Sequence, residues 1–161
     1  MEVNLRERRR RFWFLFYLLA GILAGMVMPI QTSVNTRLKG YTQSPFIASF
    51  VSFSVGSIVL VIISLLTFHD YSSIGHAIMT SPWWIWFGGG ILGTIFLTNN
   101  ILLLPKLGAA LTVMVTVCGQ MVMAILIDQF GWFSLPVHEL NPERLIGVLL
   151  MFFGVYLMQR F

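Results

Sequence analysis

The chain has 161 residues, of which 57% are hydrophobic and only 10% are charged. Soluble domains carry about 25% charged residues, so this composition excludes a soluble globular protein and indicates an integral membrane protein without room for a separate soluble domain. The formal net charge of +4 does not indicate nucleic-acid binding, because five of the ten Lys and Arg residues lie in one short run, at positions 6 and 8–11.

This basic run precedes the first apolar segment. Its position favours a cytoplasmic N-terminus and contact with anionic lipid. The apolar run that follows, Phe12–Ile30, is too long for the hydrophobic region of a signal peptide. The sequence therefore predicts a basic cytoplasmic tail, residues 1–11, and a transmembrane domain, residues 12–161.

Five apolar segments follow in chain order, each long enough to cross a hydrocarbon core of about 30 Å as an α-helix. Ser44-Pro45, Ser81-Pro82 and Asn141-Pro142 are typical helix starts, with a capping side chain before a proline. The predicted fold class is an all-α integral membrane protein with five transmembrane helices. Their expected bounds are about 12–38, 45–68, 82–104, 108–130 and 142–159.

The first segment carries a proline and a polar face. Pro29 removes a backbone donor, so a kink is expected there. Gly25 pairs with Gly21 in a GxxxG pattern that suits close helix contact, and it shares a helix face with Gln31 and Asn35. In the second segment Ser49 and Ser52 lie on a face with Gly56, which indicates packing against a neighbouring helix.

The third and fourth segments form a hairpin with a single charge, Lys106, between Trp83 and Asp128. The predicted turn is Leu104–Gly108. Gly89 and Gly93 in the third segment and Gly119 in the fourth would let helices approach closely. Between the second and third segments, residues 74–79 suggest a short interfacial turn. Asp128 lies at a helix end, where an interfacial acid is the ordinary interpretation.

The sequence contains no catalytic motif of the common hydrolase, nucleotide-binding or zinc-protease kinds. We expect His69, His76 and His138 to lie in loops, and they lack zinc-ligand spacing. The one cysteine, Cys118, lies in an apolar segment. We therefore predict that the protein is not an enzyme and needs no metal or cofactor. No charged residue lies at the centre of a segment, although cation-coupled pumps commonly place an acid there.

Uncharged polar side chains at helix depth remain as the candidate site. Amides are costly to leave unpaired in hydrocarbon, so they must face other helices or a wet cavity. Hydrogen bonding between helices is the structural alternative for each residue singly. Because the group comes from three segments, we predict that it binds a substrate, through Gln31, Asn35, Asn100, Gln120 and Thr116.

The order and spacing of several short motifs resemble the YdcZ-type family of the drug/metabolite transporter superfamily over nearly the whole chain after the tail. These motifs are Gly25-x-x-x-Pro29-x-Gln31-x-x-x-Asn35, the glycine-rich start of the third segment with Asn100, Leu107-Gly108-Ala109-Ala110, Gly119-Gln120, and Asp128-x-x-Gly131. The resemblance implies a five-span protein of the bacterial inner membrane, equivalent to half of an inverted-repeat carrier.

Such a half is expected to pair with a second copy or a paralogous half, often in the opposite orientation, and to move a small organic solute or metabolite, with export as one direction. The chain is also like the small multidrug resistance proteins in size, but it lacks their membrane-embedded glutamate. A small dimeric channel and a non-transporting membrane scaffold stay open as alternatives.

Overall fold

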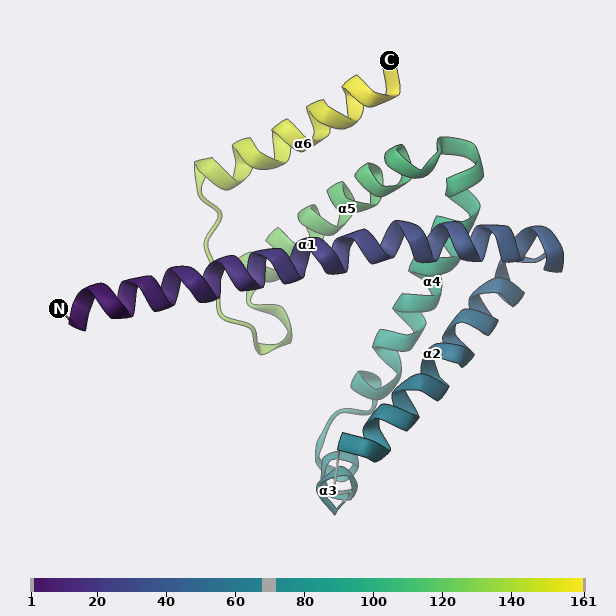
Figure 1. Ribbon diagram of the computed structural model, residues 1–161, viewed down its shortest axis with the longest axis horizontal. Coiled ribbons are helices and arrows are strands. Elements are labelled where there is room, and N and C mark those ends of the chain that lie inside the picture. Colours follow the sequence, from purple (N-terminus) through teal and green to yellow (C-terminus); the bar gives the residue numbers. More distant parts are fainter. Residues whose placement is uncertain (1, 68–71, 161) are drawn as a thin grey trace. The chain divides into compact units, whose positions relative to one another are not determined.

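The computed structural model describes the backbone of residues 2–67 and 72–160 and the side chains of residues 9, 11–67 and 74–160. His69, predicted to lie in a loop, is outside the described residues. Every regular element in the described ranges is helical, which confirms the all-α prediction. The elements are α1 Glu2–Thr42, α2 Pro45–Thr67, α3 Ser72–Thr80, α4 Trp83–Leu107, α5 Ala109–Phe130, the 3-10 turn η1 Trp132–Ser134, and α6 Pro142–Arg160 (Figure 1).

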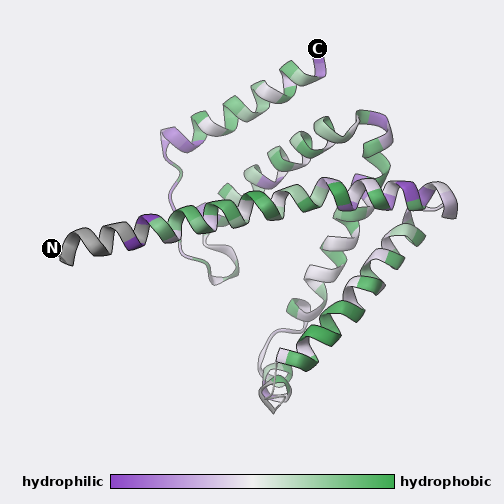
Figure 2. Cartoon of the chain, viewed as in Figure 1, coloured by the Kyte–Doolittle hydropathy of each residue, from purple (hydrophilic) through white to green (hydrophobic). Residues whose placement is uncertain are grey.

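Among the described residues, five helices are long and apolar enough to cross a membrane, as the sequence predicted. They are α1 from Arg11 onward, α2, α4, α5 and α6. Figure 2 shows hydrophobic residues along most of the length of α2. The side chains of these helices are largely exposed in the single chain, which is the expected state of a surface that faces lipid or a partner rather than water.

The connection between α4 and α5 is shorter than the predicted turn at Leu104–Gly108. Helix α4 continues through Pro105 to Leu107, and α5 begins at Ala109. Gly108 alone interrupts the helical path, with φ at 77°, a conformation that glycine adopts at little cost. A proline in the last turn of a helix removes only one backbone donor, so Pro105 does not end α4.

The chain divides into two compact units, residues 1–102 and 103–161. In the first unit α1 and α2 pack together, and a small apolar core joins Ala48, Leu97 and Ile101, with Leu38 against it. A Cβ atom placed on Gly93 of α4 would lie 3.3 Å from Phe53 Cζ of α2. The absence of a side chain at Gly93 therefore permits this helix contact.

In the second unit α5 and α6 lie side by side and antiparallel (Figure 1). Helix α5 ends at Phe130 and is capped by Gly131, whose N–H donates to Ile127 O from a left-handed conformation. The loop that follows is tied back to α5, because His138 N donates to Asp128 O over 3.0 Å and Leu140 N donates to Gln129 Oε1 over 2.7 Å. These bonds fix where α6 starts.

Gly131→Ala is expected to lower the free energy of unfolding of this unit by about 1–2 kcal/mol. Its φ is 60°, and a Cβ atom there would lie 2.8 Å from Val137 Cγ2. Thermal unfolding in detergent would measure the loss. Gly90→Ala is the control, because Gly90 lies inside α4 and nothing lies within 4 Å of its Cβ position. Equal melting of the Gly131 variant and the wild type would contradict the strain argument.

Candidate functional site

The two candidate amides of α1, Gln31 and Asn35, both lie within hydrogen-bonding distance of Ser52 on α2. Asn35 Nδ2 donates to Ser52 Oγ over 3.1 Å, and Gln31 Nε2 approaches the same oxygen at 3.5 Å. Asn35 is 4% exposed, whereas Gln31 is exposed. These residues are one turn apart on α1 because their spacing of four places them on one face. Through Ser52, the polar face of α1 forms a contact with α2.

Asn35 retains hydrogen-bonding capacity beyond this contact. An asparagine amide offers two N–H donors and a carbonyl acceptor, and Asn35 uses one donor. Within the part of the chain that the structure describes, its second N–H and its Oδ1 have no partner. A buried amide with free donors and acceptors can accept a bound polar molecule without first breaking a helix contact.

A second polar contact joins α2 to α4. Ser49 Oγ and Thr98 Oγ1 are 2.9 Å apart, and both residues are buried. Asn100, also buried, donates from Nδ2 to the carbonyl of Phe96 one turn earlier, over 2.8 Å. The other N–H and the Oδ1 of Asn100 have no partner among the described residues. Asn100 is therefore anchored to its own helix and still able to bond.

The two candidate residues on α5, Thr116 and Gln120, differ in their hydrogen bonding. Thr116 Oγ1 lies 2.9 Å from Thr112 O and 3.0 Å from Val113 O, and Thr112 Oγ1 donates to Gly108 O. Hydroxyls that bond to the preceding turn satisfy themselves within the helix. Gln120 is exposed and has no hydrogen-bond partner among the residues that the structure describes.

Gln120 also has the deepest position along its helix. It lies eleven residues after Ala109 and ten before Phe130, the ends of α5. At 1.5 Å per residue, Gln120 is about 16 Å from either end of the helix. This places its amide near the centre of a hydrocarbon core of about 30 Å, where water is normally absent.

The structure thus brings Gln31 and Asn35 together and holds Asn100 in the same unit. Thr116 and Gln120 belong to the second unit, and one cavity formed by all five residues is a prediction. Sequence reasoning assigned Ser49 and Ser52 to packing and did not place them at the site. Their common face was the available signal, but nothing in the sequence identified the amides opposite.

The predicted kink and packing residues have different surroundings. Gly93 packs against Phe53, whereas Cβ positions at Gly25, Gly89 and Gly119 have nothing within 4 Å. Helix α1 is continuous through Pro29 (Figure 1). The roles of these residues in kinking or in contact with another chain therefore stay predictions.

The structure also forms an ion pair that the sequence did not predict. Arg144 Nη1 of α6 lies 3.2 Å from Asp128 Oδ2 of α5. No group of three or more His, Cys, Asp or Glu side chains suited to a metal ion occurs among the described residues. This ion pair joins α5 to α6 within the second unit.

Comparison with known proteins decides the family. Residues 16–157 match the family described as "Putative inner membrane exporter, YdcZ". The chain belongs to the YdcZ family. Inner membrane protein YdcZ of Escherichia coli (strain K12) is 26% identical over 140 residues, which cover 86% of this chain and 91% of that protein. No solved structure matches the chain.

Family membership confirms the resemblance found in the motifs and gives the class of protein. The chain is an inner-membrane protein of a transporter family. The family description points to transport rather than to catalysis.

Proposed function

We propose that this chain is half of a paired transporter that exports a small polar organic solute across the inner membrane by alternating access. The observation that carries the proposal is Gln120, an exposed amide at the middle of a membrane-spanning helix without a partner among the described residues. A polar group in hydrocarbon without a hydrogen bond costs several kcal/mol. Gln120 must therefore meet water, a solute or a polar group of another chain.

Two buried amides support the same interpretation. Asn35 and Asn100 each use one donor in the protein and keep a donor and an acceptor free among the described residues. Amides that both donate and accept suit solutes with hydroxyl, amide or carboxylate groups. These side chains are uncharged, so a solute without a large net charge fits them best.

Open glycines support pairing with a second chain. Cβ positions at Gly25, Gly89 and Gly119 have empty space around them, so another helix could approach the backbone closely there. A five-helix half needs a second half to build an inverted-repeat pathway. We infer that the partner is a second copy or a related half, and that rocking of the halves gives each membrane face access in turn.

The double variant N35A/N100A is expected to lose about tenfold or more of the transport rate, because two solute contacts of about 1 kcal/mol each are removed. Purified protein in liposomes would be tested with a panel of radiolabelled metabolites and cations, with and without a pH gradient. Asn99→Ala is the matched control, because exposed Asn99 donates to Ile95 O of its own helix.

Wild-type transport rates in the double variant would remove Asn35 and Asn100 from the site. Single-channel currents through the wild-type protein would favour a pore over a carrier. A solved dimer in which Gln120 and the two asparagines are fully paired with protein, with no cavity between them, would favour a scaffold.

A further inference from the structure

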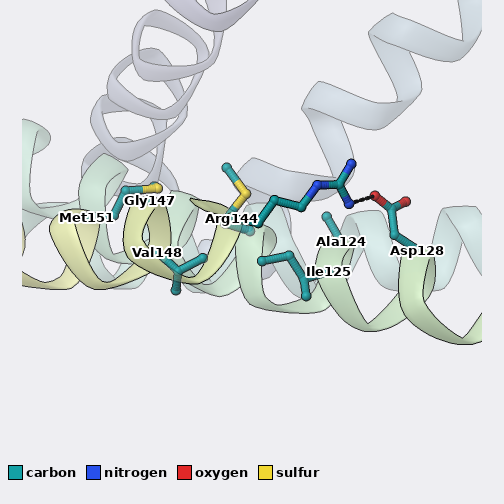
Figure 3. Close-up of a pocket in the computed structure, with 8 residues that line it drawn as sticks. Ala124, Ile125, Asp128, Arg144, Gly147, Val148 and Met151 are labelled. Carbon is teal, nitrogen blue, oxygen red and sulfur yellow. Dashed lines mark hydrogen bonds and ion pairs between the residues drawn. The ribbon is translucent and has the colours of Figure 1, made fainter. Parts of the chain in front are cut away.

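A groove of about 340 Å³ runs between α5 and α6 on the second unit (Figure 3). Its walls come from one face of each helix, with lining residues spaced three and four apart. The only charged residues in this lining are Asp128 and Arg144, which form the ion pair described above. The lining residues are Met121, Ala124, Ile125 and Asp128 of α5 and Arg144, Gly147, Val148 and Met151 of α6.

The small residues in this lining leave the space open. A Cβ atom built on Gly147 meets nothing within 4 Å, and Ala124 contributes only a methyl group to the other wall. Flexible methionines, Met121 and Met151, line the end away from the charges and can adapt to an apolar guest. The groove is therefore an apolar slot with a charged mouth.

Helix stability does not explain the two charges at the mouth. Asp128 lies near the C-terminus of α5, and Arg144 lies in the first turn of α6. The helix dipole disfavours an anion at a C-terminus and a cation at an N-terminus. Their side chains are 36% and 38% exposed, so the pair contributes little and does no more than offset these unfavourable positions.

The mouth lies at the membrane surface and the slot extends inward. Asp128 and Arg144 are each two residues from a helix end. Phe130, two residues after Asp128 in the chain, stacks on Trp132, and such aromatic residues are typical of the membrane surface. From the charges to Met121 and Met151 is seven residues on each helix, about 10 Å. The slot thus spans headgroup level and about two thirds of one leaflet of about 15 Å.

We propose that this groove binds a phospholipid whose head carries both a phosphate and a primary ammonium, that is, a phosphatidylethanolamine-type lipid. Arg144 uses one nitrogen toward Asp128, and another guanidinium nitrogen is turned away from the carboxylate (Figure 3). That side of the guanidinium can donate to the phosphate. Asp128 Oδ1 accepts from the ammonium, and one acyl chain fills the slot.

The charges select this lipid over others. A purely anionic head would meet Asp128 as well as Arg144, and like charges repel. A choline head keeps its positive charge but has no N–H to donate to Asp128. The pairing of phosphate with Arg144 and ammonium with Asp128 complements both members of the ion pair. The inference is independent of the solute that the protein transports.

Native mass spectrometry of the purified full-length protein would test the proposal, with phosphatidylethanolamine, phosphatidylcholine and phosphatidylglycerol of identical acyl chains. The wild type is expected to prefer phosphatidylethanolamine about fivefold over phosphatidylcholine, the value of roughly one exposed charge contact. Asp128→Asn should remove that preference. Gly147→Leu should reduce binding of all three lipids about fivefold or more, because it fills the slot with both charges intact.

Glu143→Gln is the matched control, because it removes a charge next to Arg144 from a residue outside the lining, and it should bind lipid as the wild type does. Circular dichroism of each variant in detergent establishes that the helices are retained. Equal binding of the ethanolamine and choline lipids by the wild type, or unchanged lipid binding by Gly147→Leu, would overturn the proposal.

Discussion

Gln120→Leu is expected to reduce the transport rate at least tenfold while the protein stays folded. Leucine has nearly the volume of glutamine and removes an amide that has no partner among the described residues of the chain. In hydrocarbon this exchange favours insertion, so thermal stability in detergent should stay equal or rise. Transport falls because a hydrogen bond to the solute, about 1.5 kcal/mol near the centre of the pathway, is lost.

The measurement pairs transport in liposomes with thermal unfolding of the same preparation. Gln120→Asn keeps an amide on a shorter side chain and should recover part of the transport rate, whereas a purely steric role would not be recovered. Val122→Leu, an apolar exchange about 200° around the helix from Gln120, should leave transport near the wild-type rate. Normal transport by Gln120→Leu would show that the amide does not meet the solute.

Thiol labelling separates a wet cavity from lipid at this depth. The chain has one cysteine, Cys118, so Cys118→Ala gives a background without thiols. Gln120→Cys in this background should react with a polar maleimide, because reaction requires a thiolate and therefore water. Val122→Cys lies about 200° around the helix and should not react. Equal reactivity at the two positions would contradict a wet face on α5.

The helices could be predicted from the sequence because their signal is local. Each needs only a long apolar run with polar or proline-containing ends, and all five occur. The predicted turn at Leu104–Gly108 is longer than the observed connection, in which the conformation of Gly108 alone makes the break. Proline near the end of a helix and proline after it give the same sequence pattern.

The contacts between helices could not be predicted, because they depend on rotation and register that apolar runs do not specify. Ser52 is one of several small residues on α2, and only the packed structure places it against Asn35 and Gln31. Asp128 and Arg144 are 16 residues apart across a loop. Their pairing depends on the hydrogen bonds that tie this loop back to α5. The periodicity of apolar residues in the sequence does not predict such bonds.

Replacing the five tail arginines with glutamines is expected to give mixed or inverted insertion. With five spans and a cytoplasmic N-terminus, the cytoplasmic side has six basic residues, the five tail arginines plus Arg144. The other side has four, Arg37, Lys39, Lys106 and Arg160. Without the tail charges the comparison becomes one against four, and the side with more Lys and Arg favours the cytoplasm.

Single cysteines in the Cys118→Ala background would report the orientation. Gly40→Cys lies near the end of α1, where a side chain has space, and Glu139→Cys lies in the exposed loop before α6. With the native tail, an impermeant maleimide added outside should label position 40 and not position 139. In the glutamine variant, position 139 should be labelled, either together with position 40 if insertion is mixed or in its place if insertion is inverted. An unchanged pattern would mean that the tail does not set the orientation.

Orientation also constrains the partner. Glutamine keeps the helix-forming tendency of α1, which runs unbroken from Glu2 to Thr42, so the variant tests charge and not helix length. If the tail holds every copy in one orientation, two copies cannot form an antiparallel pair. An inverted pathway would then require a related half with the opposite charge bias, and mixed insertion of the variant would let copies of this chain pair antiparallel with one another.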